Sequence, residues 1–229
     1  MRANLCLPLV SMGYAADARA QMAAALAHAD AIAQPMAQML AHWCACMVEI
    51  RLGQPERVQH LAEALQGIVT RRGVGQGQGP ALWYAGWAKA RLGDPEEGHR
   101  RILEGLERHE RFGMHAGCPQ VLSYAAEART LVGDWDGAAR HVDEGLALAR
   151  HMGETVAIAD LLLKRASVAL GRDDPEAARA ALREAAAEAH TDGAHERTMR
   201  DVGLDRSEIS SVEHEARHRA ERSRVRIAA

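Results

Sequence analysis

The segment Arg91-Leu92-Gly93-Asp94-Pro95-Glu96-Glu97-Gly98 determines the fold, because one predicted helix ends in it and the next begins. Gly93 accepts the left-handed backbone conformation that terminates helices without a Cβ penalty. Pro95 suits the first turn of a helix, where its missing N–H costs nothing. Glu96 follows at a position where the helix dipole favours negative charge. The segment therefore predicts a helix–turn–helix hairpin.

This turn recurs along the chain with a period of 40 residues. The glycines at that spacing are Gly13, Gly53, Gly93 and Gly133. A fifth copy has its glycine two residues early, at Gly171, and Pro175 returns to the register of Pro55 and Pro95. A fixed period of this length is typical of stacked repeats, in which each unit is one supersecondary element.

Two columns of small side chains follow the same period. The column five residues after the first four turn glycines contains Ala18, Val58, Gly98 and Ala138, and Ala178 continues it at the same 40-residue step. The column twelve residues earlier contains Cys6, Cys46, Gly86, Ala126 and Ala166. Small side chains at facing positions let two helix backbones approach closely. The columns therefore predict the contact positions within each antiparallel hairpin.

Composition agrees with an all-α fold. Alanine accounts for 46 of the 229 residues and aromatic residues for only 3%, which favours helices over sheets. The net charge of -3 gives no general reason to expect nucleic acid or an anionic membrane as a partner. Four cysteines are too few for a disulfide framework, so we expect a cytoplasmic protein.

We therefore predict a right-handed α-solenoid of about five helix hairpins over residues 1–190, followed by a short helical tail, residues 191–229. The predicted units lie near 1–34, 35–73, 80–113, 119–152 and 154–190. The N-terminal residues 1–16 also resemble a short signal peptide. We favour the repeat, because Cys6 belongs to the column of small residues.

The small-residue columns and the Gly-x-Pro/Trp-Glu/Asp turn resemble the tetratricopeptide repeat (TPR) family. The 40-residue period and turns such as 91–98 are similar to the C-terminal repeats of bacterial regulators that carry a nucleotide cyclase or LuxR-type domain and a predicted ATPase. The chain lacks their catalytic parts and begins inside a first helix, as expected of a fragment. The resemblance implies a non-catalytic protein-interaction module of a bacterial regulatory or signalling system.

In that geometry the first helix of each hairpin lines a concave groove. The candidate residues for binding a peptide or helix are Trp43, Met47, Arg51, Trp83, Trp87 and Arg91. Units four and five instead place Gln120, Ser123, Glu127, Asp160 and Ser167 there. The tryptophans have two interpretations, which we leave open here. They are either core residues between repeats or the exposed anchors of an interface.

The tail offers an alternative function. Residues 197–209 resemble the C-terminal half of the small bacterial YjiS-like family, with departures at Met199 and Val202. Some members of that family are associated with RNA. The alternative is therefore an RNA-associated protein whose tail arginines contact phosphates. These arginines are Arg217, Arg219, Arg222, Arg224 and Arg226.

Other motifs give no catalytic, metal or cofactor site. The glycine-rich segment 73–80 lacks the Lys-Ser/Thr that ends a phosphate-binding loop, so it predicts a flexible linker. The His–Cys pairs in 42–46 and 115–118 have no second ligand pair for zinc. No Gly-x-Ser-x-Gly or His-Glu-x-x-His motif occurs. We expect no enzyme, no cofactor and no membrane partner, and the sequence does not indicate an oligomeric state.

Overall fold

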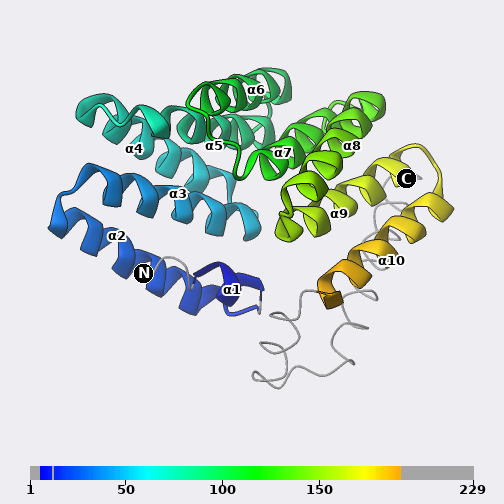
Figure 1. The fold of residues 1–229 in the computed structure, drawn as a ribbon, viewed down its shortest axis with the longest axis horizontal. Coiled ribbons are helices and arrows are strands. Elements are labelled where there is room, and N and C mark those ends of the chain that lie inside the picture. The colour runs from blue at the N-terminus through cyan, green and yellow to red at the C-terminus, as the bar shows by residue number, and fades with distance from the viewer. Residues whose placement is uncertain (1–5, 12, 192–229) are drawn as a thin grey trace. The chain divides into compact units, whose positions relative to one another are not determined.

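The computed structural model describes residues 6–11 and 13–191, and all regular secondary structure within them is helical (Figure 1). This confirms the predicted all-α class. The elements in chain order are α1 Cys6–Ser11, α2 Ala15–Ile32, α3 Pro35–Arg51, α4 Pro55–Arg72, η2 Gly75–Gly77, α5 Gln78–Arg91, α6 Pro95–Arg111, α7 Cys118–Thr130, α8 Trp135–Met152, α9 Thr155–Gly171 and α10 Pro175–Thr191.

The chain divides into two compact units, Met1–Ala185 and Ala186–Ala229. In the first unit the helices form the hairpins α1–α2, α3–α4, α5–α6 and α7–α8, and each hairpin packs on the helix that follows it. A fifth hairpin forms where Ala166 and Ala169 of α9 pack on Ala178 and Ala181 of α10. The first helices also contact one another, α1 with α3, α3 with α5, α5 with α7, and α7 with α9. This arrangement is an α-solenoid in which the first helices line one side.

The predicted turns are confirmed by their backbone conformation. The turn glycines with positive φ are Gly13, Gly53, Gly93 and Gly133, at 84°, 65°, 111° and 75°. In the fifth turn the left-handed residue is Asp173, at 59°. The helices that follow are capped by a repeated aspartate, because Asp94, Asp134 and Asp174 each accept a hydrogen bond from a backbone N–H three residues later.

The two columns of small residues are the contact positions of the hairpins, as predicted. Every member is buried, from Cys6 and Ala18 in the first hairpin to Ala166 and Ala178 in the fifth. Large side chains fill the space between hairpins, and the longest stretch of core joins α3 to α7. A second cluster joins α7, α8 and α9 with Ala185 of α10.

The prediction of a flexible linker at residues 73–80 is wrong. Gly75–Gly77 forms a 3-10 turn, α5 begins at Gln78, and Gly77, Gly79 and Pro80 are buried. A Cβ on Gly77 would lie 2.4 Å from Cγ2 of Val69, so only glycine fits against α4. The glycines therefore serve close packing between two hairpins rather than mobility.

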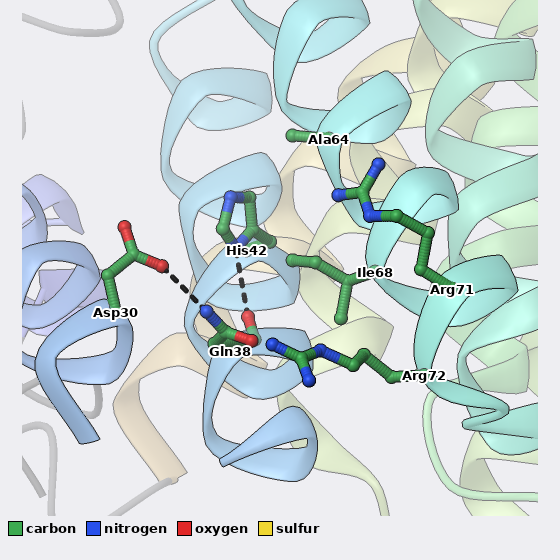
Figure 2. Close-up of a pocket in the computed structure, with 7 residues that line it drawn as sticks. All are labelled: Asp30, Gln38, His42, Ala64, Ile68, Arg71 and Arg72. Atoms are coloured by element: carbon green, nitrogen blue, oxygen red, sulfur yellow. Dashed lines mark hydrogen bonds between the residues drawn. The ribbon is translucent and has the colours of Figure 1, made fainter. Parts of the chain in front are cut away.

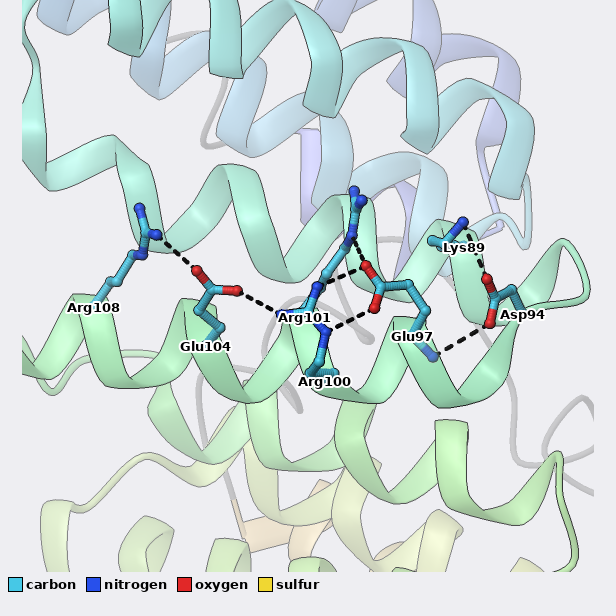
Figure 3. Close-up of polar contacts among 7 residues, drawn as sticks. All are labelled: Lys89, Asp94, Glu97, Arg100, Arg101, Glu104 and Arg108. Carbon is cyan, nitrogen blue, oxygen red and sulfur yellow. Dashed lines mark hydrogen bonds and ion pairs between the residues drawn. The ribbon is translucent and has the colours of Figure 1, made fainter.

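The outer side of α6 carries a series of ion pairs (Figure 3). Glu97 accepts hydrogen bonds from Arg100 and Arg101, and Glu104 binds Arg108 at 2.7 Å. These hydrogen bonds lower the pKa of the Glu97 carboxyl to about 2. Such exposed pairs contribute little stability each. They give this second helix a polar outer surface on which the arginines are paired.

Candidate partner-binding face

The first helices α3, α5, α7 and α9 present a common surface, which we call the concave face. On α3 its residues recur at spacings of three and four, so they share one side of the helix. These residues are Met36, Leu40, Trp43, Met47 and Arg51. On α9 the equivalent side carries Val156, Asp160, Leu163 and Ser167. The helices α5 and α7 lie between them.

The tryptophans predicted for this face belong mainly to the core. Trp83 is 2% exposed and Trp87 is 3% exposed, while Trp43 is half-buried against them. The rings of Trp43 and Trp83 meet edge to face with centroids 5.9 Å apart. This favours the core interpretation and corrects the expectation of an exposed aromatic strip. The large rings are buried because the facing hairpin helix presents small residues that let the helices approach.

Glu127 of α7 binds polar groups from two other helices, α5 and α9. Its carboxylate accepts hydrogen bonds from Lys164 Nζ at 2.8 Å, from Arg91 at 3.3 Å and from Trp87 Nε1 at 3.3 Å. Burial raises the pKa of Glu127, but Lys164, Trp87 and Arg91 together outweigh burial and hold that pKa below its ordinary value. Glu127 is therefore a charged acceptor that ties α5, α7 and α9 together.

A second ion pair joins the two sides of the concave face. Arg51 at the end of α3 lies 3.3 Å from the Asp160 carboxylate on α9, although the two residues are 109 positions apart. Tyr124 of α7 is buried, and burial, followed by the Asp160 charge, raises the pKa of its phenol. The concave face is therefore narrow enough at this level for one arginine side chain to span it.

The helices α3 and α9 also carry exposed aliphatic side chains. Met36 and Leu40 on α3 are 44% and 48% exposed, and Val156 and Leu163 on α9 are 66% and 48% exposed. Of the predicted residues, Arg51 and Arg91 reach the surface and Met47 is half-buried against the core. The sequence analysis placed Asp160 and Ser167 on this face but missed Lys164, Val156 and Leu163. Lys164 shares the 40-residue register of Cys44, Tyr84 and Tyr124, and that register could have brought it to attention.

The remaining expectations from the sequence concern the C-terminal tail, metal binding and the membrane. The YjiS-like segment 197–209 and the five tail arginines fall outside the described residues. Among residues 6–11 and 13–191 no cluster of three histidine, cysteine or acidic side chains is placed to hold a metal ion. In the same residues no helix has the length and apolar character needed to cross a membrane.

Comparison with known proteins gives likeness at the level of the fold. No protein-family model matches the chain, and no curated protein matches it. BtubC (BKLC) from P. vanneervenii has a similar structure, with a TM-score of 0.56 and 16% identity over 82% of this chain and 78% of BtubC. A Podosopora anserina putative kinesin light chain with nearly identical TPR-like repeats has a TM-score of 0.51 and 11% identity, over 83% and 93% of the two chains. The chain therefore has a TPR-like repeat fold.

Proposed function

We propose that the chain is a non-catalytic protein-interaction module whose concave face binds a peptide or helix of a partner protein. The TPR-like fold supports an interaction role in general, although a fold alone does not specify a function. The bacterial regulatory role that we infer rests on the resemblance of the turns at 91–98 and their 40-residue copies to regulator repeats.

One observation carries this proposal. The helices α3 and α9 carry exposed aliphatic side chains, and the same two helices carry Arg51, Asp160 and Lys164 of the ion pairs. A partner segment with apolar residues would bury Leu40 and Leu163, and its acidic groups would compete with Asp160 for Arg51. In this version of the proposal, Trp83 and Trp87 support the face from beneath, and Trp43, Met47, Arg51 and Arg91 contribute to it directly.

A phage-displayed peptide library panned on the immobilised full-length chain would test this proposal. We expect enriched peptides to lose about tenfold or more in affinity when Leu40→Asp or Leu163→Asp is introduced, because the charge would have to be desolvated. Leu182→Asp is the matched control, since Leu182 is an exposed leucine on the second helix α10. Equal binding to all three variants, or no enrichment, would contradict the proposal.

The RNA alternative rests on the tail sequence alone. Contacts from Arg217 to Arg226 with phosphates would weaken steeply as salt rises and would be lost on deleting residues 214–229. Binding at the concave face would tolerate both changes. Fluorescence titrations of the full-length and truncated chains against single-stranded RNA, at low and high salt, separate the two functions.

A further inference from the structure

A polar pocket of about 230 Å³ lies between the first two described hairpins, away from the ion pairs of the concave face (Figure 2). Its walls come from the second helices α2 and α4, and α3 contributes the residues between them. The lining residues are Asp30, Gln38, His42, Ala64, Ile68, Arg71 and Arg72. The function proposed above does not involve this pocket, so an experiment on the pocket tests it independently of that function.

Two adjacent arginines dominate the chemistry of this pocket. Arg71 and Arg72 end α4, and both side chains extend toward the α3 residues in Figure 2. Within residues 6–11 and 13–191, neither guanidinium has a carboxylate at ion-pair distance. On α6 the arginines at 100, 101, 108 and 111 all have glutamate partners. Arg71 and Arg72 are both exposed, so the edge of the pocket carries two positive charges that have no ion-pair partner in the described part of the chain.

The repeat register explains why Arg71 has no acidic partner. One period later Arg111 pairs with Glu107, four residues before it on the same helix. The residue that corresponds to Glu107 in α4 is Gly67. A Cβ on Gly67 would lie 2.9 Å from Nη1 of Arg71, so this guanidinium lies directly over the glycine. The second hairpin thus has a glycine where the third has the neutralising acid.

His42, which also lines the pocket, differs in residue type from the residues at its register position in later hairpins. The corresponding residues one, two and three periods later are Leu82, Leu122 and Leu162. His42 Nδ1 lies 2.9 Å from the carbonyl oxygen of Gln38, and this contact requires Nδ1 to carry the proton and donate it. Nε2 is then an acceptor in the neutral ring, and it donates to a phosphate oxygen only when it also carries a proton. A position that holds leucine in three units is polar only where it borders the two arginines.

We propose that this pocket binds a phosphate monoester on a serine or threonine side chain of a partner polypeptide. Two guanidinium groups match the charge of about -1.5 to -2 and the three acceptor oxygens of such a group. A carboxylate needs only one guanidinium for a bidentate pair. Asp30 lies at the α2 side, where its Oδ1 accepts from Gln38 at 2.9 Å. Its carboxylate remains an acceptor for a backbone N–H of the bound polypeptide.

Isothermal titration of the full chain with a five-residue alanine peptide carrying one central phosphoserine tests this site. We expect saturable binding, with affinity about tenfold lower in Arg72→Gln and in Arg71→Gln, and a smaller loss in His42→Leu. His42→Leu installs the leucine of the other units, so it should preserve the fold. Arg111→Gln is the control in the same register and should leave binding unchanged. Circular dichroism melting checks that each variant is folded.

Three results would overturn the proposal. The first is equal affinity for the phosphorylated peptide and its serine or glutamate counterparts. The second is unchanged phosphopeptide binding in both arginine variants, which would leave Arg71 and Arg72 as surface residues at the end of α4. The third is inorganic phosphate binding as tightly as the phosphopeptide, which would identify a free-anion site instead of a site for a modified partner.

Discussion

Gly98 of α6 faces Gly86 of α5 so closely that a Cβ added to either residue would lie 2.6 Å from the carbonyl oxygen of the other. Farther along the same two helices, Gly105 and Gly79 repeat this relationship, with a Cβ at 2.7 Å. The backbones of the α5–α6 hairpin therefore touch at two levels. The atoms that an added methyl group would meet belong to backbone, which cannot move aside as a flexible side chain can.

Gly98→Ala should therefore destabilise the protein, by about 1–3 kcal/mol through overpacking. Gly67→Ala is the control, because its Cβ meets only the flexible end of Arg71 within α4. Alanine at an open helical position should stabilise by roughly 0.5–1 kcal/mol. Urea unfolding of both variants measures the difference. Similar free energies of unfolding would mean that the α5–α6 contact is looser than described.

A second prediction concerns the turns between hairpins. Gly73, Gly113 and Gly153 have φ near 70°, and Ala33 occupies the same register with φ of 55°. Alanine in the left-handed conformation costs the folded state about 1 kcal/mol, and glycine removes this cost. Glycine also increases the conformational entropy of the unfolded chain, and this increase offsets part of the gain. Ala33→Gly should thus raise the free energy of unfolding by about 0.5 kcal/mol. Gly113→Ala, the reverse change at the same register position two periods later, should lower the free energy of unfolding. Two changes of the same sign would refute this account.

Those turns illustrate what could be predicted from the sequence. Gly53, Gly93 and Gly133 each lie two residues before a proline or tryptophan, and Gly13 has the same 40-residue spacing, so the sequence indicates both where one helix ends and where the next begins. The column at 73, 113 and 153 has the same period but lies in dissimilar surroundings, and it was missed. Gly75, Gly77 and Gly79 were misjudged because glycine content alone does not distinguish a mobile segment from one packed tightly against a neighbour.

The candidate site was harder to predict than the fold. Register placed Trp83 and Trp87 on first helices, but it could not give the curvature that decides how much of each ring the neighbouring hairpin covers. The approach of Arg51 to Asp160 depends on that curvature summed over three hairpins. Likewise, the convergence of Arg71 and Arg72 on His42 joins two helices whose spacing no sequence period specifies.

A third prediction follows from two facing histidines. His99 Nε2 on α6 lies 2.9 Å from His141 Nε2 on α8. Burial, then the charge of the opposite ring, lowers the pKa of His99 from 6.5 to about 4, and burial likewise lowers the pKa of His141. Between those values the unfolded chain binds protons that the folded chain does not, so stability should fall as pH drops from 6.5 towards 4.

For His99 the loss between pH 7 and pH 5 should be about 1 kcal/mol, after allowing for solvent contact of the half-buried ring. Equilibrium urea unfolding at the two pH values measures the loss, and His99→Gln should reduce it. His60→Gln is the control, because the His60 side chain is largely exposed. A pH dependence that is unchanged by His99→Gln would mean that other groups titrate in this range.

The last prediction separates structural from surface ion pairs. The Glu127 side chain is 15% exposed and binds Lys164, Arg91 and Trp87. Asp143 is 69% exposed and, among the described residues, pairs with Arg165 alone. Glu127→Gln keeps the shape of the side chain but removes the charge, and it leaves the Lys164 ammonium without its anion. The free energy of unfolding should fall by about 1–3 kcal/mol, the range for a lost charged partner in a partly buried site.

Asp143→Asn makes the same chemical change in water and should stay within about 0.5 kcal/mol. Adding Lys164→Met to Glu127→Gln should cost less than the sum of the two single changes, because the second change removes the ammonium that the first left unpaired. Thermal and urea unfolding of the wild type, Glu127→Gln, Lys164→Met and the double variant complete the cycle. Strict additivity would show that Lys164 and Glu127 contribute independently, and α7 and α9 would then be held together by their apolar contacts alone.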